Sequence, residues 1–136
     1  MNFQKKYSQV SYSSLNSKQR ENYNFHKVAA TLADYGFNSL RLNDDWQGAD
    51  FIAVHISGND MIKIQLKGRF TMDKKYVGKD LYIAFLENKK VKLYYHDDAI
   101  NMIPENIENS TSWIRDGLYT WGKTPLIYEP IISILN

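Results

Sequence analysis

The middle of the chain carries two apolar-rich runs, residues 49–56 and 61–67, separated by a short polar segment. The pair Gly58-Asn59 lies between them. Short apolar runs on either side of a Gly-Asn pair are typical of a β-hairpin with a two-residue loop. We therefore predict an antiparallel hairpin over residues 49–67.

A two-residue loop determines which side chains of this hairpin lie opposite one another. It places Asp50 opposite Lys67 and Ile52 opposite Gln65. Directly opposed residues of antiparallel strands point to the same face, so Asp50, Gln65 and Lys67 converge at one end of the hairpin. A change of one residue in the loop would reverse this parity and separate the cluster. The opposite face is apolar and predicts a core: Phe51, Ala53, Ile62, Ile64 and Leu66.

A helix is predicted upstream of the hairpin. It begins with an N-cap at Asn16 or Ser17 and ends near Gly36. Glu21 lies in its first part, near one end of the apolar stripe, and is either an acid of a functional site or a first-turn residue favoured by the helix dipole. The stripe itself has helical spacing: Phe25, Val28, Ala29 and Leu32.

The remaining pattern predicts more strands. Residues 37–42 form a first strand, followed by a polar loop over 43–48 in which Asp44 and Asp45 are turn residues or supplementary metal ligands. A nearly continuous apolar run at 80–86 predicts a buried strand, which returns over 91–95 after a turn.

The C-terminal part predicts only short elements. We expect a short helix through Met102, a loop over 105–112 and packing of the nearby aromatic residues. Residues 126–135 form either a short helix after Pro130 or a strand that covers a sheet edge or a partner subunit. These elements together predict an α/β domain with a helix, three strands, two further strands and short C-terminal elements.

Composition sets the broad class. The chain has 136 residues, which is enough for one domain with a real core, and 43% hydrophobic content argues against disorder. A net charge of +2 permits nucleic-acid binding without arguing for it. The sequence has no cysteine, which excludes disulfides and thiolate metal sites, and no apolar run long enough for a membrane span. It also lacks an apolar signal core, so we expect a cytoplasmic protein without a membrane partner.

Residues 1–16 are expected to form a polar, basic arm, and residues 17–136 a single domain. The arm contains Lys5 and Lys6 and no acidic residue. It is either a basic segment that contacts phosphates, or an ordered extension or subunit contact.

The residues at the predicted hairpin end suit a hard cation. Asp50 offers a carboxylate, Gln65 an amide oxygen and Leu66 a backbone carbonyl. Mg²⁺ needs few protein ligands because it keeps several waters. A water on such an ion is acidic enough to attack a phosphodiester, and Lys67 could orient it or offset charge on the phosphate.

At these positions the chain resembles the PD-(D/E)XK nuclease superfamily, with its restriction-endonuclease-like fold. The pattern is an Asp that opens one strand and Glu-X-Lys or Gln-X-Lys on the next, here Asp50 and Gln65-Leu66-Lys67. A preceding helix with Glu21 and a Gly-Phe stop extends the resemblance to archaeal-type Holliday junction resolvases, over roughly residues 17–86. The resemblance implies an αβββ core with a mixed sheet, a metal held by Asp50 and Gln65, a catalytic Lys67 and an assisting Glu21.

The resemblance also implies a substrate and an assembly. We expect Mg²⁺- or Mn²⁺-dependent endonuclease activity on duplex or branched DNA, carried out by a homodimer. A basic stretch beyond the hairpin would bind phosphates or else form a solvated loop: Arg69, Lys74, Lys75 and Lys79.

The pattern departs from the superfamily at two places. Gly48-Ala49 stands where a proline usually precedes the Asp, and Gln65 replaces the commoner Glu. Loss of that carboxylate should weaken metal affinity. The alternatives are a catalytically decayed nucleic-acid-binding module on the same fold, and a protein-binding module such as an immunity or antitoxin-like chain.

Overall fold

The computed structural model describes residues 1–135, which form a mixed α/β structure. The helices are α1 (Phe3–Lys6), α2 (Ser17–Ala33), α3 (His96–Ile100), α4 (Glu105–Glu108) and α5 (Thr111–Asp116), with 3₁₀ turns η1 (Tyr12–Ser14), η2 (Lys74–Tyr76) and η3 (Leu126–Ile131). The strands are β1 (Phe37–Trp46), β2 (Ala49–His55), β3 (Met61–Leu66), β4 (Thr71–Asp73), β5 (Leu81–Glu87), β6 (Lys90–Tyr95), β7 (Leu118–Thr120) and β8 (Ile132–Leu135).

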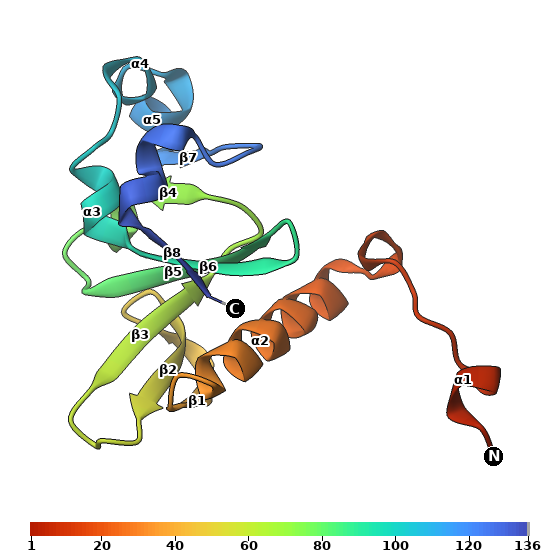
Figure 1. Ribbon diagram of the computed structural model, residues 1–136. Coiled ribbons are helices and arrows are strands. Elements are labelled where there is room, and N and C mark those ends of the chain that lie inside the picture. The colour runs from red at the N-terminus through yellow and green to blue at the C-terminus, as the bar shows by residue number, and fades with distance from the viewer. Residues whose placement is uncertain (136) are drawn as a thin grey trace.

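One six-stranded sheet organises the molecule (Figure 1). Its order is β1-β2-β3-β5-β6-β8, and all neighbours are antiparallel except β3 and β5, which are parallel. Strands β4 and β7 form a separate two-stranded sheet. The predicted α/β class and mixed sheet are therefore confirmed.

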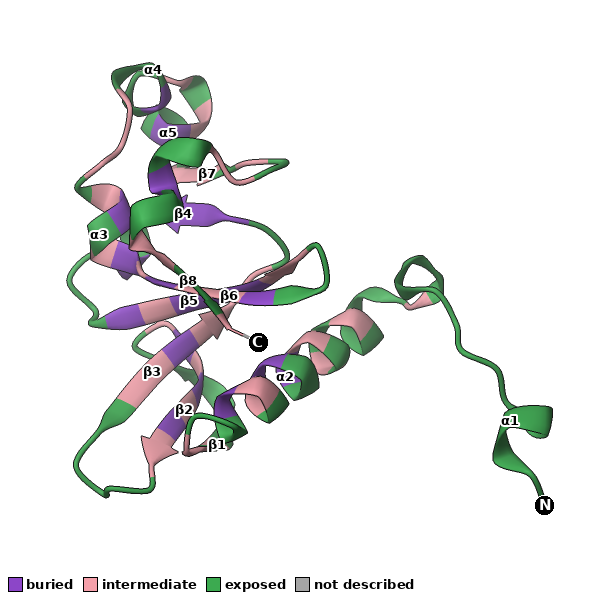
Figure 2. Cartoon of the chain, viewed as in Figure 1, coloured by how far each residue is buried: buried purple, intermediate pink, exposed green. Residues whose placement is uncertain are grey.

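Helix α2 forms as predicted and packs on one face of the sheet. The Asn16 side chain accepts a hydrogen bond from the Gln19 backbone N–H, and the Gln19 side chain accepts one from the Asn16 N–H, which completes a capping box. The buried residues of the helix are Phe25, Val28 and Leu32, and Figure 2 shows the buried part of α2 near β1 and β2. They pack with residues from four strands: Phe51, Ala53, Ile64, Ala84 and Val91.

A second core covers the other face of the C-terminal half of the sheet. Phe70 lies at its centre, with ring centroids 4.7 Å from Tyr94, 4.7 Å from Tyr128 and 5.2 Å from Trp121. The Tyr94 hydroxyl accepts a hydrogen bond from the Thr71 N–H (3.3 Å) and donates one to the Thr71 carbonyl, which ties β4 to β6. The expectation that the C-terminal aromatic residues pack is confirmed.

The β2–β3 hairpin has a longer loop than predicted. Phe51 pairs with Ile64, and the His55 N–H donates to the Asp60 carbonyl (2.8 Å), so the loop spans residues 56–59. The predicted two-residue loop is wrong, because Gly58 has a positive φ of 77° but Asn59 is not among the positive-φ residues of the described chain. A type I′ turn needs both. The register moves by two residues, so the parity of the two faces is unchanged.

Strand β1 continues through the predicted polar loop. Arg41 pairs with Phe51 and Trp46 with Ala49, so β1 carries three more residues than β2 in between and bulges there. Gln47 (φ 53°) and Gly48 (φ 86°) then form a tight turn into β2. The prediction of a loop over 43–48 is therefore wrong for its first four residues.

The C-terminal predictions are confirmed in part. The segment 105–112, predicted as a loop, contains α4 and the start of α5, which is capped by the Ser110 side chain at the Trp113 N–H. Residues 126–135 form η3 and then β8, which covers the edge of β6. Within residues 1–135, no helix combines the length and apolar character needed to cross a membrane.

The N-terminal arm begins with α1, which lies away from the body of the protein (Figure 1), and reaches α2 through 3₁₀ turn η1. Its helix α1 buries no residue, and Phe3, Tyr7 and Val10 are exposed.

Candidate functional site

Asp50 and Leu66 join the ends of β2 and β3. The Asp50 Oδ2 accepts a hydrogen bond of 2.8 Å from the Leu66 N–H. The β2–β3 ladder ends at the Phe51–Ile64 pair, and the same register continued by one residue would put Asp50 opposite Gln65. The structure thus joins Asp50 to Leu66, and its register favours Gln65 over Lys67 as the residue opposite Asp50.

Gly48 allows β2 to begin at this place. Its φ of 86° favours glycine, and a Cβ there would lie 3.0 Å from the Tyr76 Cδ1 and 3.2 Å from the Leu81 Cδ2. Ala49, which follows, is fully buried. The turn that carries Asp50 is therefore set by packing against Tyr76 and Leu81.

A small acidic cavity of about 150 Å³ lies beside Asp50. Glu21 comes from α2, Asp44 and Asp45 come from the bulge of β1, and Leu66 closes the cavity from β3. Asp45 also accepts a hydrogen bond of 2.8 Å from the Gly48 N–H, so it acts as a turn residue as well as a cavity residue. The β1 bulge thus supplies acids that a regular strand would not place here.

Arg41 holds Glu21 at the mouth of this cavity. Its guanidinium lies 3.7 Å from the Glu21 carboxylate, donates to the Asn22 Oδ1 at 2.9 Å and lies 4.7 Å from the centre of the Phe25 ring. Glu21 is 53% exposed and also pairs with Lys18 at 3.7 Å. It therefore reaches the cavity from the solvent side.

Asp50 carries an unfavourable charge in this setting. Burial raises the pKa of Asp50, the Leu66 hydrogen bond opposes that effect, and the carboxylates of Glu21 and Asp45 raise it further. Lys67 lowers the pKa of Asp50 again, but it ranks last among these influences. A cation near Asp50 would relieve this accumulation of negative charge.

Gln65 has one amide atom without a partner. Its Nε2 donates to the Leu66 carbonyl at 3.2 Å, while its Oε1 is buried and finds no hydrogen-bond partner within residues 1–135. Gln65 is in register with Ile83, a residue of the second core. A buried amide oxygen without a donor is costly, and a cation would satisfy it.

Lys67 follows β3 and lies over an aromatic ring. Its Nζ is 5.3 Å from the centre of the Tyr76 ring, and the Lys75 Nζ is 5.2 Å from the same ring. Burial lowers the pKa of Lys67, and Lys75 lowers it further, against the opposing effects of Asp73, Asp50 and Asp45. A half-buried lysine with a lowered pKa beside a cavity is a candidate functional residue.

The predicted site residues do not share one cavity, and among the described residues Gln65 lines neither of the two cavities beside Asp50 and Lys67. In the described part of the chain, Glu21, Asp50 and Leu66 line the acidic cavity, whereas Gln65 and Lys67 do not. A neighbouring cavity of about 410 Å³ is lined by Lys67 and Arg69, and it shares Glu21 and Leu66 with the first. The acidic cluster and the predicted lysine thus face a common rim.

The other predicted phosphate-binding residues make local contacts. The Lys74 Nζ lies 5.3 Å from the centre of the Trp113 ring, and Lys75 pairs with Asp73 at 3.6 Å. The Lys79 carbonyl accepts from Lys63, whose Nζ also donates to the Gln47 side chain at 2.9 Å. Arg69 is the member of this group that lines a cavity next to the site.

Sequence reasoning missed Arg41, Tyr76 and His96. Arg41 lies on the α2 side of β1 because it pairs with Phe51, and this side can be assigned only once the β1–β2 register is known. His96 is fully buried, and its Nε2 accepts from the Asp73 N–H at 3.1 Å, which helps to fix β4. No local motif marked these residues, because the partners of Arg41 on α2 and the Asp73 partner of His96 lie more than fifteen residues away, and Tyr76 meets Lys67 only through the fold.

The donors at the site fit a hard, oxygen-preferring cation in part. The described residues contain no group of three or more His, Cys, Asp or Glu side chains placed to hold a metal. The predicted set depends instead on one carboxylate, an amide oxygen and a backbone carbonyl, which suits an ion that keeps its waters. Since Gln65 Nε2 donates to the Leu66 carbonyl, its amide must turn for both oxygens to face one ion.

Comparison with known proteins gives no relative for this chain. No protein-family model, no curated protein and no solved structure matches it.

Proposed function

We propose that the protein is a Mg²⁺- or Mn²⁺-dependent endonuclease that hydrolyses phosphodiester bonds in DNA, on a restriction-endonuclease-like core. The observation that carries the proposal is the hydrogen bond from the Leu66 N–H to the Asp50 carboxylate, which joins Asp50 to the Gln65-Leu66-Lys67 segment at the ends of two adjacent strands. The resemblance of these residues to the PD-(D/E)XK pattern needs this meeting, and an odd shift of register would have abolished it.

The order of elements also supports the restriction-endonuclease-like core. Helix α2 is followed by the antiparallel strands β1, β2 and β3, and β5 then lies parallel to β3. This is the αβββ arrangement with a mixed sheet that the resemblance implies. Because one fold serves many activities, the proposed function depends on the residues of the site and not on the fold class.

Asp50, Gln65 and the Leu66 carbonyl are the proposed metal ligands. The raised pKa of Asp50 and the partnerless Gln65 Oε1 both favour a cation between them. When bound, such an ion supplies charge neutralisation for the phosphate and a more acidic water. Glu21 stands at the solvent side of the cavity, where its carboxylate would serve as the general base for the attacking water.

Lys67 is the proposed catalytic ammonium. Its lowered pKa reflects burial and the nearby Lys75, so it can give up or hold a proton closer to neutral pH than an exposed lysine. In its charged form it stabilises negative charge that develops on the phosphate. Two sites in a homodimer would act on the two strands of duplex or branched DNA.

A catalytically decayed nucleic-acid-binding module is the second candidate. One observation favours it: the Gln65 Nε2 donates to the Leu66 carbonyl, so the amide satisfies this carbonyl without a cation. A glutamate at this position would leave the carbonyl in need of a metal or a proton. The neutral residue thus removes part of the reason for the site to bind a metal.

The test is cleavage of duplex, branched and single-stranded DNA across a titration of Mg²⁺ and Mn²⁺. Wild type is compared with Asp50→Ala, Lys67→Ala and Asp60→Asn. Asp60 lies at the far end of the same hairpin and serves as a matched acidic control. We expect cleavage by wild type and Asp60→Asn, and loss of at least a hundredfold in the other two.

Two results would count against the nuclease. Cleavage that persists in Asp50→Ala would show that the catalytic site does not include Asp50. Binding of DNA without cleavage, unchanged by chelator, would support the decayed module instead.

A further inference from the structure

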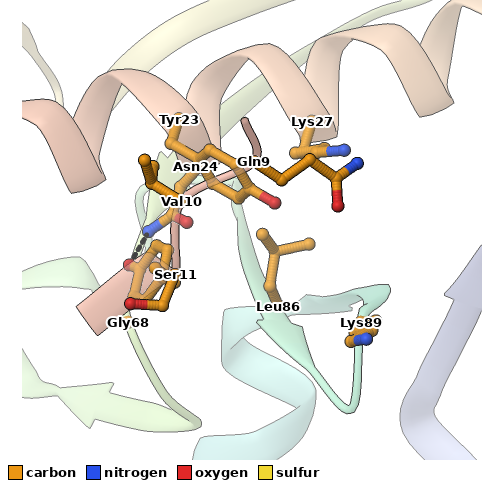
Figure 3. Close-up of a pocket in the computed structure, with 10 residues that line it drawn as sticks. Gln9, Val10, Ser11, Tyr23, Asn24, Lys27, Gly68, Leu86 and Lys89 are labelled. Carbon is orange, nitrogen blue, oxygen red and sulfur yellow. Dashed lines mark hydrogen bonds between the residues drawn. The ribbon is translucent and has the colours of Figure 1, made fainter. Parts of the chain in front are cut away.

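A groove continues from the candidate site along α2. It consists of the cavity of about 410 Å³ beside Lys67 and a larger cavity of about 690 Å³ (Figure 3), which share Tyr12, Asn24 and Gly68. The smaller cavity shares Glu21 and Leu66 with the acidic cavity. A path therefore runs from Asp50, past Lys67, to the far part of α2.

The outer wall of the groove is the N-terminal arm, and it is fastened to α2. The Arg20 guanidinium donates to the Tyr12 carbonyl at 3.3 Å and to the Ser13 carbonyl at 2.9 Å. The Asn24 side-chain amide donates to the Tyr12 hydroxyl at 3.0 Å. These bonds tie 3₁₀ turn η1 to the first half of the helix, so the wall has a defined position.

Aromatic rings stand in this groove. The Tyr12 and Tyr23 centroids are 5.4 Å apart with an angle of 65° between the rings, and both residues stay partly exposed, at 43% and 40%. Lys27 lies over the Tyr23 ring at 5.4 Å and lines the same cavity. Exposed tyrosine rings next to cations are the features on which unpaired bases stack.

The groove is lined mainly by positively charged side chains. Of the described residues that line the two cavities, five are cationic, from α2, the β3–β4 connection and the β5–β6 turn, whereas Glu21 is the acidic one. The cations are Arg20, Lys27, Lys67, Arg69 and Lys89. This sign suits a phosphate backbone.

We infer that the groove between the N-terminal arm and α2 binds a single-stranded segment of DNA and leads it to the acidic cavity. A paired base offers no free face to Tyr23, so the rings select an unpaired strand such as a flap or the single-stranded part of a branch. The inference rests on the proposed nuclease function for cleavage of the strand at the acidic cavity. It narrows the substrate to DNA with an unpaired segment.

The test measures binding apart from cleavage. Fluorescence anisotropy in chelator follows a labelled oligodeoxythymidine strand and the same strand annealed to its complement. We compare Tyr23→Leu with Tyr23→Phe, which keeps the ring, and Lys27→Gln with Lys123→Gln, an exposed lysine outside both cavities as residues 1–135 define them. Thermal melting confirms that each variant is folded.

We expect wild type to bind the single strand more tightly than the duplex. Tyr23→Leu should weaken strand binding about 5- to 150-fold, the range for loss of one stacked base, while Tyr23→Phe binds like wild type. Lys27→Gln should lower the slope of log K against log salt by about 0.7, as for one phosphate of a single strand, and Lys123→Gln should leave it unchanged.

Equal binding of strand and duplex, or equal binding by Tyr23→Leu and wild type, would overturn the inference. Neither result depends on cleavage. Failure of the proposed nuclease has a different signature: strand-selective binding that depends on Tyr23, with no cleavage at any metal concentration.

Discussion

The substitution Gln65→Glu tests the candidate site most directly, because it adds a carboxylate opposite Asp50. The register that pairs Phe51 with Ile64, continued by one residue, puts the two positions face to face. The new carboxylate would also replace the Nε2 that donates to the Leu66 carbonyl at 3.2 Å, and would thus set an oxygen against an oxygen. We expect the variant to be less stable than wild type without metal and to gain more from Mg²⁺.

The magnitude follows from the spacing of opposed residues. Cβ atoms of a directly opposed pair are about 4.5–5.5 Å apart, so the carboxylates lie about 6 Å apart. At an effective dielectric constant of about 20 their repulsion is about 2–3 kcal/mol. With an unfolding entropy of about 2.1 cal/mol/K per residue over 136 residues, the melting temperature should fall by about 7–10 °C.

The assay is thermal melting in chelator and in rising Mg²⁺, at several pH values. In chelator, the fall in melting temperature of Gln65→Glu should become smaller as the pH falls toward 4, because protonation of a carboxylate removes the repulsion. At a Mg²⁺ concentration about a hundredfold above Kd, binding adds about 2.7 kcal/mol, enough to restore the melting temperature. Gln65→Leu is the matched control: it removes the partnerless oxygen and also the Nε2 donor to the Leu66 carbonyl, so it should change stability less than Gln65→Glu in chelator and should not gain from Mg²⁺ as Gln65→Glu does.

Two outcomes would refute this reasoning. If Gln65→Glu melts like wild type in chelator at neutral pH, residue 65 does not face the Asp50 carboxylate. If the variant is destabilised but Mg²⁺ restores it no more than it shifts wild type, the two side chains meet but do not form a cation site.

Three further predictions concern neighbouring residues. Asp50→Asn should raise the melting temperature in chelator at neutral pH, because the raised pKa of Asp50 makes its charge unfavourable in the folded state, and melts from pH 8 to 4 should show this gain fading as the wild-type carboxyl becomes protonated. Lys67→Ala should abolish cleavage but keep the Mg²⁺-induced rise in melting temperature, measured in parallel on one preparation. Tyr94→Phe should cost about 2–4 kcal/mol in urea unfolding, because it leaves the buried Thr71 N–H and carbonyl without their shared partner; an unchanged midpoint would mean that another group replaces the hydroxyl.

The sequence predicts the face of the candidate site better than its exact pairing. The alternation in β2 and β3 determines which side chains share a face. The observed four-residue loop changes the predicted register by two residues, so the same side chains still share a face. The loop length depends on local contacts that no pattern shows: the Ser57 hydroxyl bonds the His55 ring at 3.0 Å and accepts from the Asn59 N–H at 3.2 Å. Predictions based on Gly-Asn alone therefore miss the longer loop.

Long-range contacts explain the other differences. Strand β4 is three residues long, and its burial depends on Tyr94 and His96, both 23 residues away. The sequence predicts a loop at the β1 bulge because Asn43, Asp44 and Asp45 are residue types that favour turns. Their strand conformation comes from pairing with β2, which propensity cannot supply.

The bulge in β1 also bears on how two chains can meet. Strand β1 is an edge of the six-stranded sheet, and an unbroken edge offers backbone groups to which another chain can add and begin aggregation. The irregular stretch between Arg41 and Trp46 interrupts that template and places two aspartates on it. Addition of sheet to sheet along this edge is thereby disfavoured.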